Sequence, residues 1–290
     1  MVLLGHEIAY CSQVARYAAE ARGIRWREHP VDITRHEQYE SWYLKFNPKG
    51  YVPTMLVGPS NKVVVESIDI AEHLDTIGKQ LVPKSGEAAE RYQQLRQLHQ
   101  DWEVGVFTYG CSQKESFLAR TLLPRHFATS LVKLEQQMGR NIADAKVLTL
   151  LRDKHTSRVE LWIAANDRKR VGVARHQAIA MLKQCDEWLG SSPYLCGQEF
   201  TLADVLFSTA LGRMQYIAGF WRKEVLSRPK VLAYFTRAEQ TDAYRNAKVG
   251  VFMPSVTNTV FHSSMAVLVF VLGAVVAELS QIFGLGHGAT

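Results

Sequence analysis

The sequence contains few cysteines, and none of them belongs to a recognisable metal or redox motif. Its 4 cysteines are far apart, at Cys11, Cys111, Cys185 and Cys196. This spacing excludes a disulfide scaffold and a C-x-x-C pair, and it predicts a reducing compartment. The 10 histidines form no H-E-x-x-H or comparable pattern, so we expect no metal cofactor.

The first residues also lack a basic segment followed by a long apolar run, so we expect no secretory signal. No internal repeat or low-complexity segment interrupts the 290 residues. A hydrophobic fraction of 47% and a charged fraction of 21% are typical of globular proteins and exclude disordered and collagen-like chains. The length predicts two domains.

Basic residues are concentrated in one stretch. Of the net charge of +6, residues 120–175 contribute +7, from 12 basic and 5 acidic side chains, which leaves −1 for the rest. The most compact basic cluster in this stretch is Arg168, Lys169 and Arg170. The stretch is predicted either to contact anionic lipid or a protein partner, or to be a solvated helical face. We expect no nucleic-acid partner.

The first 78 residues alternate between strand and helix patterns. The pattern predicts strands at residues 2–4, 27–33, 54–57 and 62–65, and helices ending at Gly23 and Gly78. Ser67 is predicted to be the N-cap of the second helix. The order is β-α-β followed by β-β-α, which predicts an α/β domain over residues 1–78.

The remainder of the chain is predicted to be helical. Residues 79–86 contain glycine, proline and serine and are interpreted as a linker to an all-helical domain at 87–248. Helix candidates are residues 87–107, 177–189, 201–220 and 228–242. The periodicity of the basic stretch at about 120–175 is too weak to place its helices.

A hydrophobic tail follows at residues 249–290. Its run of 21 residues, 265–285, contains only Glu278, Ser280 and Gln281 as polar side chains. As a helix the run would extend about 31 Å, close to the thickness of a bilayer core. We therefore expect a C-terminal membrane anchor, although Glu278 disfavours insertion by about 2.5–3.5 kcal/mol at the bilayer centre. An amphipathic helix, on the protein or in the membrane interface, is the alternative.

Three motifs resemble those of a known fold. They are Tyr51-Val52-Pro53 before the predicted hairpin, Glu66-Ser67 after it, and residues 193–205 with Thr201-Leu-Ala-Asp204. Together they resemble the glutathione S-transferase fold over residues 1–248. The resemblance implies a thioredoxin-like α/β N-terminal domain and an all-α C-terminal domain. Thr201 and Asp204 would form a capping box that starts a buried helix, which is a feature of the fold rather than of catalysis.

Within that superfamily the chain most resembles the ganglioside-induced differentiation-associated proteins. The resemblance lies in Phe107-Thr-Tyr-Gly-Cys111, the basic insertion and the hydrophobic tail. It implies a tail-anchored, cytosol-facing protein of the mitochondrial outer membrane, acting on organelle dynamics or redox state. The tail has no basic residues after the span, so peroxisome and endoplasmic reticulum stay open as locations. A homodimer also stays open.

The resemblance implies a glutathione site. If the bond before Pro53 is cis, the N–H and C=O of Val52 would pair with the tripeptide as a short strand. Ser67 would hold the γ-glutamyl carboxylate at a helix N-terminus, and Glu66 would face the γ-glutamyl ammonium. A simple N-cap role for Ser67 is the alternative. Trp102, Phe107 and Tyr109 could line a second-substrate pocket or belong to the core.

The group that stabilises the thiolate is the uncertain part of the site. The resemblance places Ala9 where serine-type transferases carry serine, followed by Tyr10, Cys11 and Ser12 as candidate catalytic residues. Ala9 cannot donate a hydrogen bond. Tyr51 likewise replaces the lysine or glutamine that many members use near the glycyl carboxylate. Both departures argue against ordinary conjugation.

Cys11 is the strongest catalytic candidate. It lies at a predicted helix N-terminus with Arg16 about one turn away, an environment that lowers the pKa of a thiol. A buried, unreactive thiol is the alternative. The leading hypothesis is a membrane-tethered protein that binds or senses glutathione. An active transferase or Cys11-dependent thiol reductase is the second hypothesis, and a scaffold with a decayed site is the third, so enzymatic activity is left open.

Overall fold

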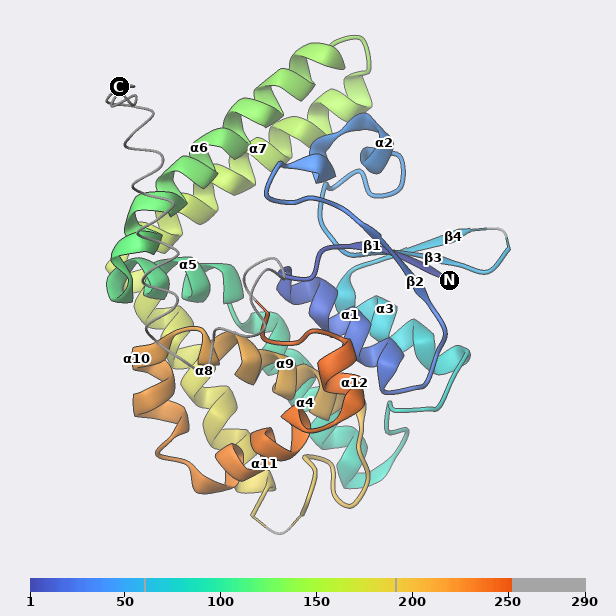
Figure 1. The fold of residues 1–290 in the computed structure, drawn as a ribbon, viewed down its shortest axis with the longest axis vertical. Helices are drawn as coiled ribbons and strands as arrows, with labels where there is room; N and C mark the ends of the chain where they lie inside the picture. The colour runs from blue at the N-terminus through green and yellow to red at the C-terminus, as the bar shows by residue number, and fades with distance from the viewer. Residues whose placement is uncertain (60, 191, 252–290) are drawn as a thin grey trace, which may run out of the picture. The chain divides into compact units, whose positions relative to one another are not determined.

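The computed structural model describes residues 1–59, 61–190 and 192–251 (Figure 1). An α/β part precedes a helical part. The elements are β1 (Val2–Gly5), α1 (Tyr10–Glu20), β2 (Arg27–Pro30), η1 (Glu37–Tyr39), α2 (Ser41–Leu44), β3 (Thr54–Val57), β4 (Lys62–Val65), α3 (Ser67–His73), η2 (Leu74–Thr76), α4 (Gly86–Asp101), α5 (Val104–Glu115), α6 (Phe117–Arg140), α7 (Ala145–Asn166), α8 (Arg168–Trp188), α9 (Leu202–Gln215), α10 (Ala218–Phe220), the π-helical turn η3 (Trp221–Val225), α11 (Pro229–Glu239) and α12 (Asp242–Asn246).

The α/β part is a thioredoxin-like sheet with strand order β2-β1-β3-β4. β1 pairs parallel with β2 and antiparallel with β3, and β3 pairs antiparallel with β4. Because successive side chains of a strand face opposite sides, Leu3 packs into the main core with α1 and α3, whereas Leu4 packs against Tyr43 of α2. Figure 1 shows α1 and α3 together on one side of the sheet. The predicted β-α-β and β-β-α order is confirmed.

The helix α1 forms where the apolar spacing predicts it. Val14, Tyr17 and Ala18 are fully buried on the face that meets the core. The chain then turns at Gly23, which has a φ of 64° that glycine adopts without a steric penalty. The burial of this face fixes α1 and thereby the position of the loop that precedes it.

Two sequence predictions about helix starts and ends are wrong. Ser67 is not an N-cap, because Glu66 occupies that position with a φ of 64°, and Ser67 is the first residue of α3. The predicted helix at 87–107 is broken after Asp101, where Trp102 takes an extended ψ of 113°. The Trp102 ring packs against Tyr10 and Phe107 in the core, a tertiary contact that overrides helix propensity.

The basic stretch that the periodicity could not place is an antiparallel helical hairpin. α6 and α7 lie side by side and project together beyond the sheet (Figure 1). Both helices have side-chain N-caps, since Ser116 accepts from the Ala119 N–H at 3.2 Å and Asp144 accepts from the Val147 N–H at 3.0 Å. The hairpin forms one wall of the cleft described below.

The capping box predicted at Thr201 and Asp204 is confirmed. The buried Asp204 carboxylate accepts hydrogen bonds from the Thr201 N–H at 2.8 Å, the Leu195 N–H at 3.1 Å and the Tyr234 hydroxyl at 3.0 Å. α9, which this box starts, is buried along its length and packs against α1 and α4. The box therefore anchors the central helix of the helical part to the α/β part.

The predicted membrane span at 265–285 lies outside the described residues, as does most of the tail at 249–290. Among residues 1–59, 61–190 and 192–251, no helix has both the length and the apolar character needed to cross a bilayer.

Candidate active site

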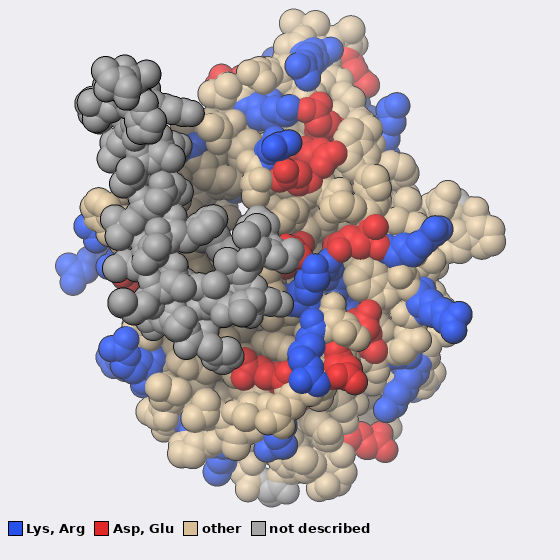
Figure 2. All heavy atoms as spheres, viewed as in Figure 1, with Lys and Arg blue, Asp and Glu red and all other residues tan. Residues whose placement is uncertain are grey.

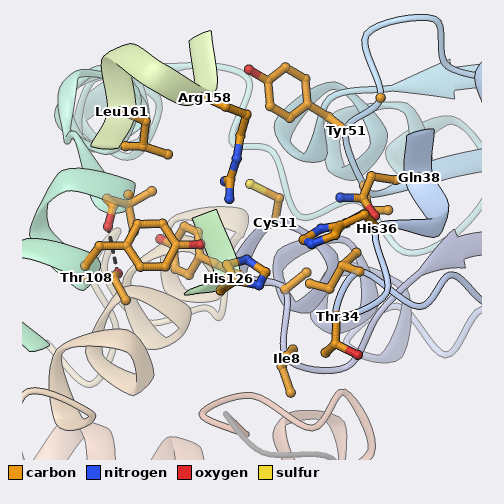
Figure 3. A pocket seen from close by; sticks show the side chains of 18 of the residues that line it. Ile8, Cys11, Thr34, His36, Gln38, Tyr51, Thr108, His126, Arg158 and Leu161 are labelled. Atoms are coloured by element: carbon orange, nitrogen blue, oxygen red, sulfur yellow. Dashed lines mark hydrogen bonds between the residues drawn. The ribbon is translucent and has the colours of Figure 1, made fainter. Parts of the chain in front are cut away.

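A cleft of about 490 Å³ lies between the α/β part and the helical part. Its floor is the loop before α1 and the start of that helix, and one side is formed by segments between β2 and β3. The opposite side is formed by α5, α6, α7 and α9. Figure 3 shows side chains from both parts converging on this space.

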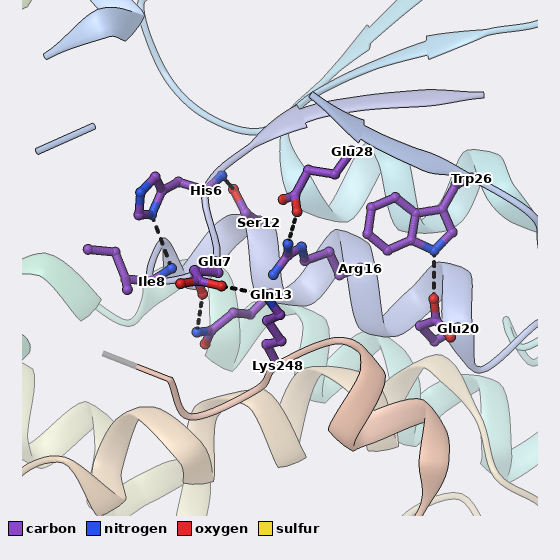
Figure 4. Close-up of polar contacts among 10 residues, drawn as sticks. All are labelled: His6, Glu7, Ile8, Ser12, Gln13, Arg16, Glu20, Trp26, Glu28 and Lys248. Carbon is purple, nitrogen blue, oxygen red and sulfur yellow. Dashed lines mark hydrogen bonds and ion pairs between the residues drawn. The ribbon is translucent and has the colours of Figure 1, made fainter. Parts of the chain in front are cut away.

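Cys11, the second residue of α1, faces the cleft (Figure 3). A hydrogen bond with the Ser67 side chain and the nearby Arg213 cation act to lower its pKa, but desolvation outweighs both and raises the pKa above its ordinary value of 9.0. The predicted lowering is therefore wrong for the ligand-free protein. Arg16, which was expected to assist, points to the other side of α1 and pairs with Glu28 (Figure 4).

The two neighbours of Cys11 make other contacts, although Tyr10 also lines the cleft. Successive residues of a helix are rotated by about 100°, so three adjacent side chains cannot share one direction. The buried Tyr10 hydroxyl lies 2.6 Å from Nε2 of His99. Burial lowers the pKa of His99 to about 4, so its ring is neutral at neutral pH, and the hydroxyl and Nε2 share one hydrogen bond. Ser12 is fully buried behind the loop, and its Oγ accepts from the His6 N–H at 3.3 Å (Figure 4).

The predicted glutathione-binding residues lie on two neighbouring loops. The bond between Val52 and Pro53 is cis, as predicted, and Val52 lines the cleft. The carbonyl of Tyr51 accepts hydrogen bonds from the Tyr43 hydroxyl at 2.5 Å and the Asn47 amide at 2.8 Å, which holds this loop in place. β3 begins only at Thr54, so the polar backbone groups of Val52 lie outside the sheet.

Glu66 and Ser67 differ in exposure. The Glu66 carboxylate is exposed and lies 3.3 Å from Nζ of Lys49. Ser67 is 9% exposed and is linked to Cys11 by its side chain. The two residues that the sequence grouped as one binding motif thus have separate contacts, and of the two only Ser67 is hydrogen-bonded with the Cys11 thiol.

Sequence reasoning missed three cationic residues of the cleft, which are Lys154 and Arg158 of α7 and Arg213 of α9. Lys154 is 6% exposed, and burial together with the Arg158 cation lowers its pKa to about 6. Arg213 donates to the Ile8 carbonyl at 3.2 Å and lies over the Tyr10 ring. The only sequence signal for the first two was their spacing of four residues, which places both on one helix face.

Two histidines in the cleft are neutral. His36 and His126 lie with ring centroids 5.0 Å apart. Burial and the Arg158 cation lower the pKa of each ring to about 4, so neither is charged at neutral pH. Within the part of the chain that the structure describes, no cluster of three or more His, Cys, Asp or Glu side chains could hold a metal.

The aromatic residues and the basic cluster named in the sequence analysis lie in different parts of the structure. Trp102 and Phe107 are buried in the core, whereas Tyr109 lines the cleft. The basic cluster at 168–170 starts α8, where Asp167 caps the helix and Arg170 pairs with Glu103. On the face shown in Figure 2, basic and acidic side chains are interspersed.

This geometry can be compared with known proteins. The glutathione S-transferase N-terminal domain family matches residues 10–77, and the corresponding C-terminal domain family matches residues 123–237. The chain belongs to the glutathione S-transferase superfamily. The two matches include the whole of α1 with Cys11, the cis-Pro53 loop and the whole of α7.

Curated relatives agree with this assignment. The chain is 26% identical over 257 residues to the tetrachloro-p-hydroquinone reductive dehalogenase of Sphingobium chlorophenolicum, covering 85% of this chain and 95% of the relative. It is 22% identical over 279 residues to human ganglioside-induced differentiation-associated protein 1-like 1, covering 84% and 72%. The predicted resemblance to that family is confirmed.

Solved structures show the same fold. Glutathione transferase F7 of Populus trichocarpa matches with a TM-score of 0.58 at 16% identity, over 86% of this chain and 98% of that one. The theta class glutathione S-transferase of Xanthomonas axonopodis pv. citri, solved with glutathione bound, matches with a TM-score of 0.57 at 17% identity, over 87% and 98%. At these identities the likeness establishes the fold alone.

Proposed function

We propose that this protein binds glutathione in the cleft and exchanges disulfides with it through Cys11. The observation that carries the proposal is the position of the Cys11 thiol, which faces the cleft beside the cis-Pro53 loop and is hydrogen-bonded with Ser67. The relative named as a reductive dehalogenase, matched over 95% of its length, supports reductive chemistry on this scaffold. Conjugation assisted by a hydroxyl at position 9 is disfavoured, because Ala9 has none.

Each part of glutathione has a partner of suitable chemistry in this arrangement. The N–H and C=O of Val52 pair with the cysteinyl unit as a short antiparallel strand. Ser67, at the start of α3, offers its N–H and hydroxyl to the γ-glutamyl carboxylate. Glu66 takes the γ-glutamyl ammonium in place of Lys49, with which it pairs in the ligand-free protein.

The proposed reaction proceeds in two balanced steps. The Cys11 thiolate attacks the glutathionyl sulfur of a mixed disulfide, so a bond forms between Cys11 and glutathione and the substrate leaves as a thiolate. A second glutathione thiolate then attacks that bond, releasing glutathione disulfide and restoring the Cys11 thiolate. The thiol is reactive only when deprotonated, and its raised pKa makes the reaction faster as pH increases toward 9.

The experiment is performed on the full chain. Calorimetry with reduced glutathione tests binding, and mass spectrometry after incubation with glutathione disulfide tests for one glutathionyl adduct per chain. We expect binding in both the wild type and Cys11→Ser, and an adduct that is lost in Cys11→Ser but kept in Cys196→Ser. Cys196 is a suitable control because it is also partly exposed and lies outside the cleft. Glutathione binding without an adduct would contradict disulfide exchange and indicate a glutathione sensor. Absence of both binding and the adduct would overturn the whole proposal.

We further propose that the protein faces the cytosol and acts at an organelle membrane, namely the mitochondrial outer membrane. This proposal depends on the apolar run at 265–285 and on the ganglioside-induced differentiation-associated relatives. A fluorescent fusion tests it, since removal of residues 252–290 should release the protein into the cytosol. An unchanged distribution after that deletion would contradict membrane tethering.

A further inference from the structure

We propose that Lys154 and Arg158 on α7 together hold the carboxylate of a second substrate that has an apolar body. The inference rests on the proposed function, because the second substrate is the molecule that would react beside glutathione at Cys11. It concerns the helical wall of the cleft, whereas the glutathione contacts proposed above lie on the α/β side.

The first argument is the charge of the cleft. Three basic side chains line it, of which Lys154 is mostly uncharged at neutral pH in the ligand-free protein, and no described lining residue is acidic. Its histidines His36 and His126 are neutral at neutral pH and do not change this balance. A concave site with one sign of charge and low-dielectric walls attracts the opposite charge, so the cleft favours an anion.

The second argument is that Lys154 and Arg158 have no acidic partner among the described residues. Arg213 is engaged with the Ile8 carbonyl and the Tyr10 ring. Arg158 donates from Nε to the Ser130 hydroxyl at 3.0 Å and stacks on Phe127, and these are neutral partners. Among the described residues no carboxylate lies within ion-pair distance of Arg158 or Lys154. Figure 3 shows Arg158 directed into the cleft beside Cys11.

The third argument is the unusual position of Lys154. Its amino group lies over the Tyr51 ring, with the Tyr39 ring 5.9 Å away. The charged groups that act on it are the Arg158 cation and the more distant Glu66 carboxylate, which Lys49 already neutralises. An amine that is 94% buried beside the Arg158 cation carries its charge at neutral pH only when an anion joins them. A bound carboxylate would supply that anion.

The shape of the wall selects the class of anion. A carboxylate presents two oxygens, so it can accept one hydrogen bond from each of two donors four residues apart on a helix. Further along α7, Leu161 lines the same cleft with Val104 and Leu123, so the body of the ligand meets an apolar surface. An aromatic or branched carboxylic acid matches both features.

The probes are 4-nitrobenzoate and the uncharged, similarly shaped 4-nitrobenzamide. Calorimetry measures their binding to the full chain at neutral pH, with and without saturating S-methylglutathione, which has both glutathione carboxylates but no free thiol. The variants are Lys154→Met and Arg158→Gln, with Arg152→Gln as the matched control because Arg152 is an exposed cation on the same helix. Circular dichroism checks that each variant is folded.

We expect 4-nitrobenzoate to bind at least about tenfold more tightly than the amide, and each cleft variant to lose about tenfold. Arg152→Gln should retain the wild-type value. Binding should also take up on the order of one proton at neutral pH, because the carboxylate recharges Lys154, and this uptake should vanish in Lys154→Met. Equal binding of acid and amide would overturn the proposal.

A second result would overturn it differently. If the two variants weaken S-methylglutathione as much as they weaken 4-nitrobenzoate, the pair holds the glycyl carboxylate of glutathione and not a second substrate. Failure of S-methylglutathione to bind the wild type would instead contradict the proposed function. In that case the measurement on ligand-free protein still decides whether the α7 pair selects a carboxylate.

Discussion

Two buried ionisable side chains in this protein have opposite surroundings. Asp204, in the capping box, is fully buried, and its carboxylate accepts hydrogen bonds from Thr201, Leu195 and Tyr234. Lys154, in the cleft, is nearly as buried, but no described acidic group pairs with it. The comparison teaches that burial alone does not identify a functional group. The Asp204 carboxylate with its hydrogen-bond donors holds the fold, whereas the Lys154 amine has aromatic but no acidic neighbours and is where we propose that a ligand carboxylate binds.

The strongest test of this difference is Asp204→Ala. The substitution leaves the Thr201 and Leu195 N–H groups and the Tyr234 hydroxyl without their acceptor in the core, and we expect a loss of about 3–5 kcal/mol in the free energy of unfolding. Chemical denaturation measures it. The exposed Asp242→Ala should change the same quantity by no more than about 0.5 kcal/mol. A loss below 1 kcal/mol for Asp204→Ala would contradict the structural role.

Lys154→Met is expected to increase the free energy of unfolding, whereas Asp204→Ala decreases it. Replacement of an unpaired buried amine by an apolar side chain of similar length should stabilise the ligand-free protein by about 1–4 kcal/mol at neutral pH. The substitution should also remove the part of the pH dependence of folding stability that arises from Lys154. The pKa of Lys154 is about 6 in the folded protein against 10.5 in the unfolded chain, so the unfolded chain binds more protons across this window.

The stability of the wild type should therefore increase as pH rises from about 6 toward 9, by up to about 1.4 kcal/mol per pH unit, and decrease as pH falls through that range. Urea denaturation at several pH values tests this slope. If Lys154→Met keeps the wild-type slope, another group is responsible and the unpaired amine is not the origin.

A smaller change in stability is expected at the hydrogen-bonded pair of Tyr10 and His99. Tyr10→Phe removes the hydroxyl that lies 2.6 Å from the buried His99 ring and leaves that ring nitrogen without its hydrogen-bond partner. We expect a loss of about 1–2 kcal/mol in stability and no change in the alkylation rate of Cys11. A parallel loss of Cys11 reactivity would assign Tyr10 to the reaction rather than to packing.

The smallest effect is expected on the reactivity of the Cys11 thiol, which has a hydrogen bond with Ser67 but a raised pKa. Ser67→Ala removes the hydrogen bond that lowers its pKa, so the pKa should rise further and alkylation by iodoacetamide at a fixed alkaline pH should slow by about 2–10-fold. Ser12→Ala is the matched control, since the Ser12 hydroxyl accepts from His6 instead. Equal slowing in both variants would mean that the loop, and not the Ser67 hydroxyl, sets the thiol pKa.

Much of the fold could be predicted because it depends on local patterns. The spacing of Val14, Tyr17 and Ala18, and the capping box at Thr201, each act within a few residues of chain. The predictions that failed depended on distant contacts. The helix break at Trp102 follows from packing against Tyr10, and the direction of Arg16 follows from its pairing with Glu28. Neither partner is visible in the neighbouring sequence.

The sequence by itself determined the superfamily, the cis-Pro53 loop and the candidate thiol Cys11, because each is a short motif whose chemistry is carried by adjacent residues. Only the tertiary structure decided that Tyr10 and Cys11 line the cleft whereas Ser12 does not, since a helix rotation of about 100° per residue separates their side chains. It also decided that Lys154 and Arg158, about 140 residues away along the chain, face the same space. The charge and burial of a side chain depend on its neighbours in the folded protein. In this cleft those neighbours belong to elements that are far apart in the sequence.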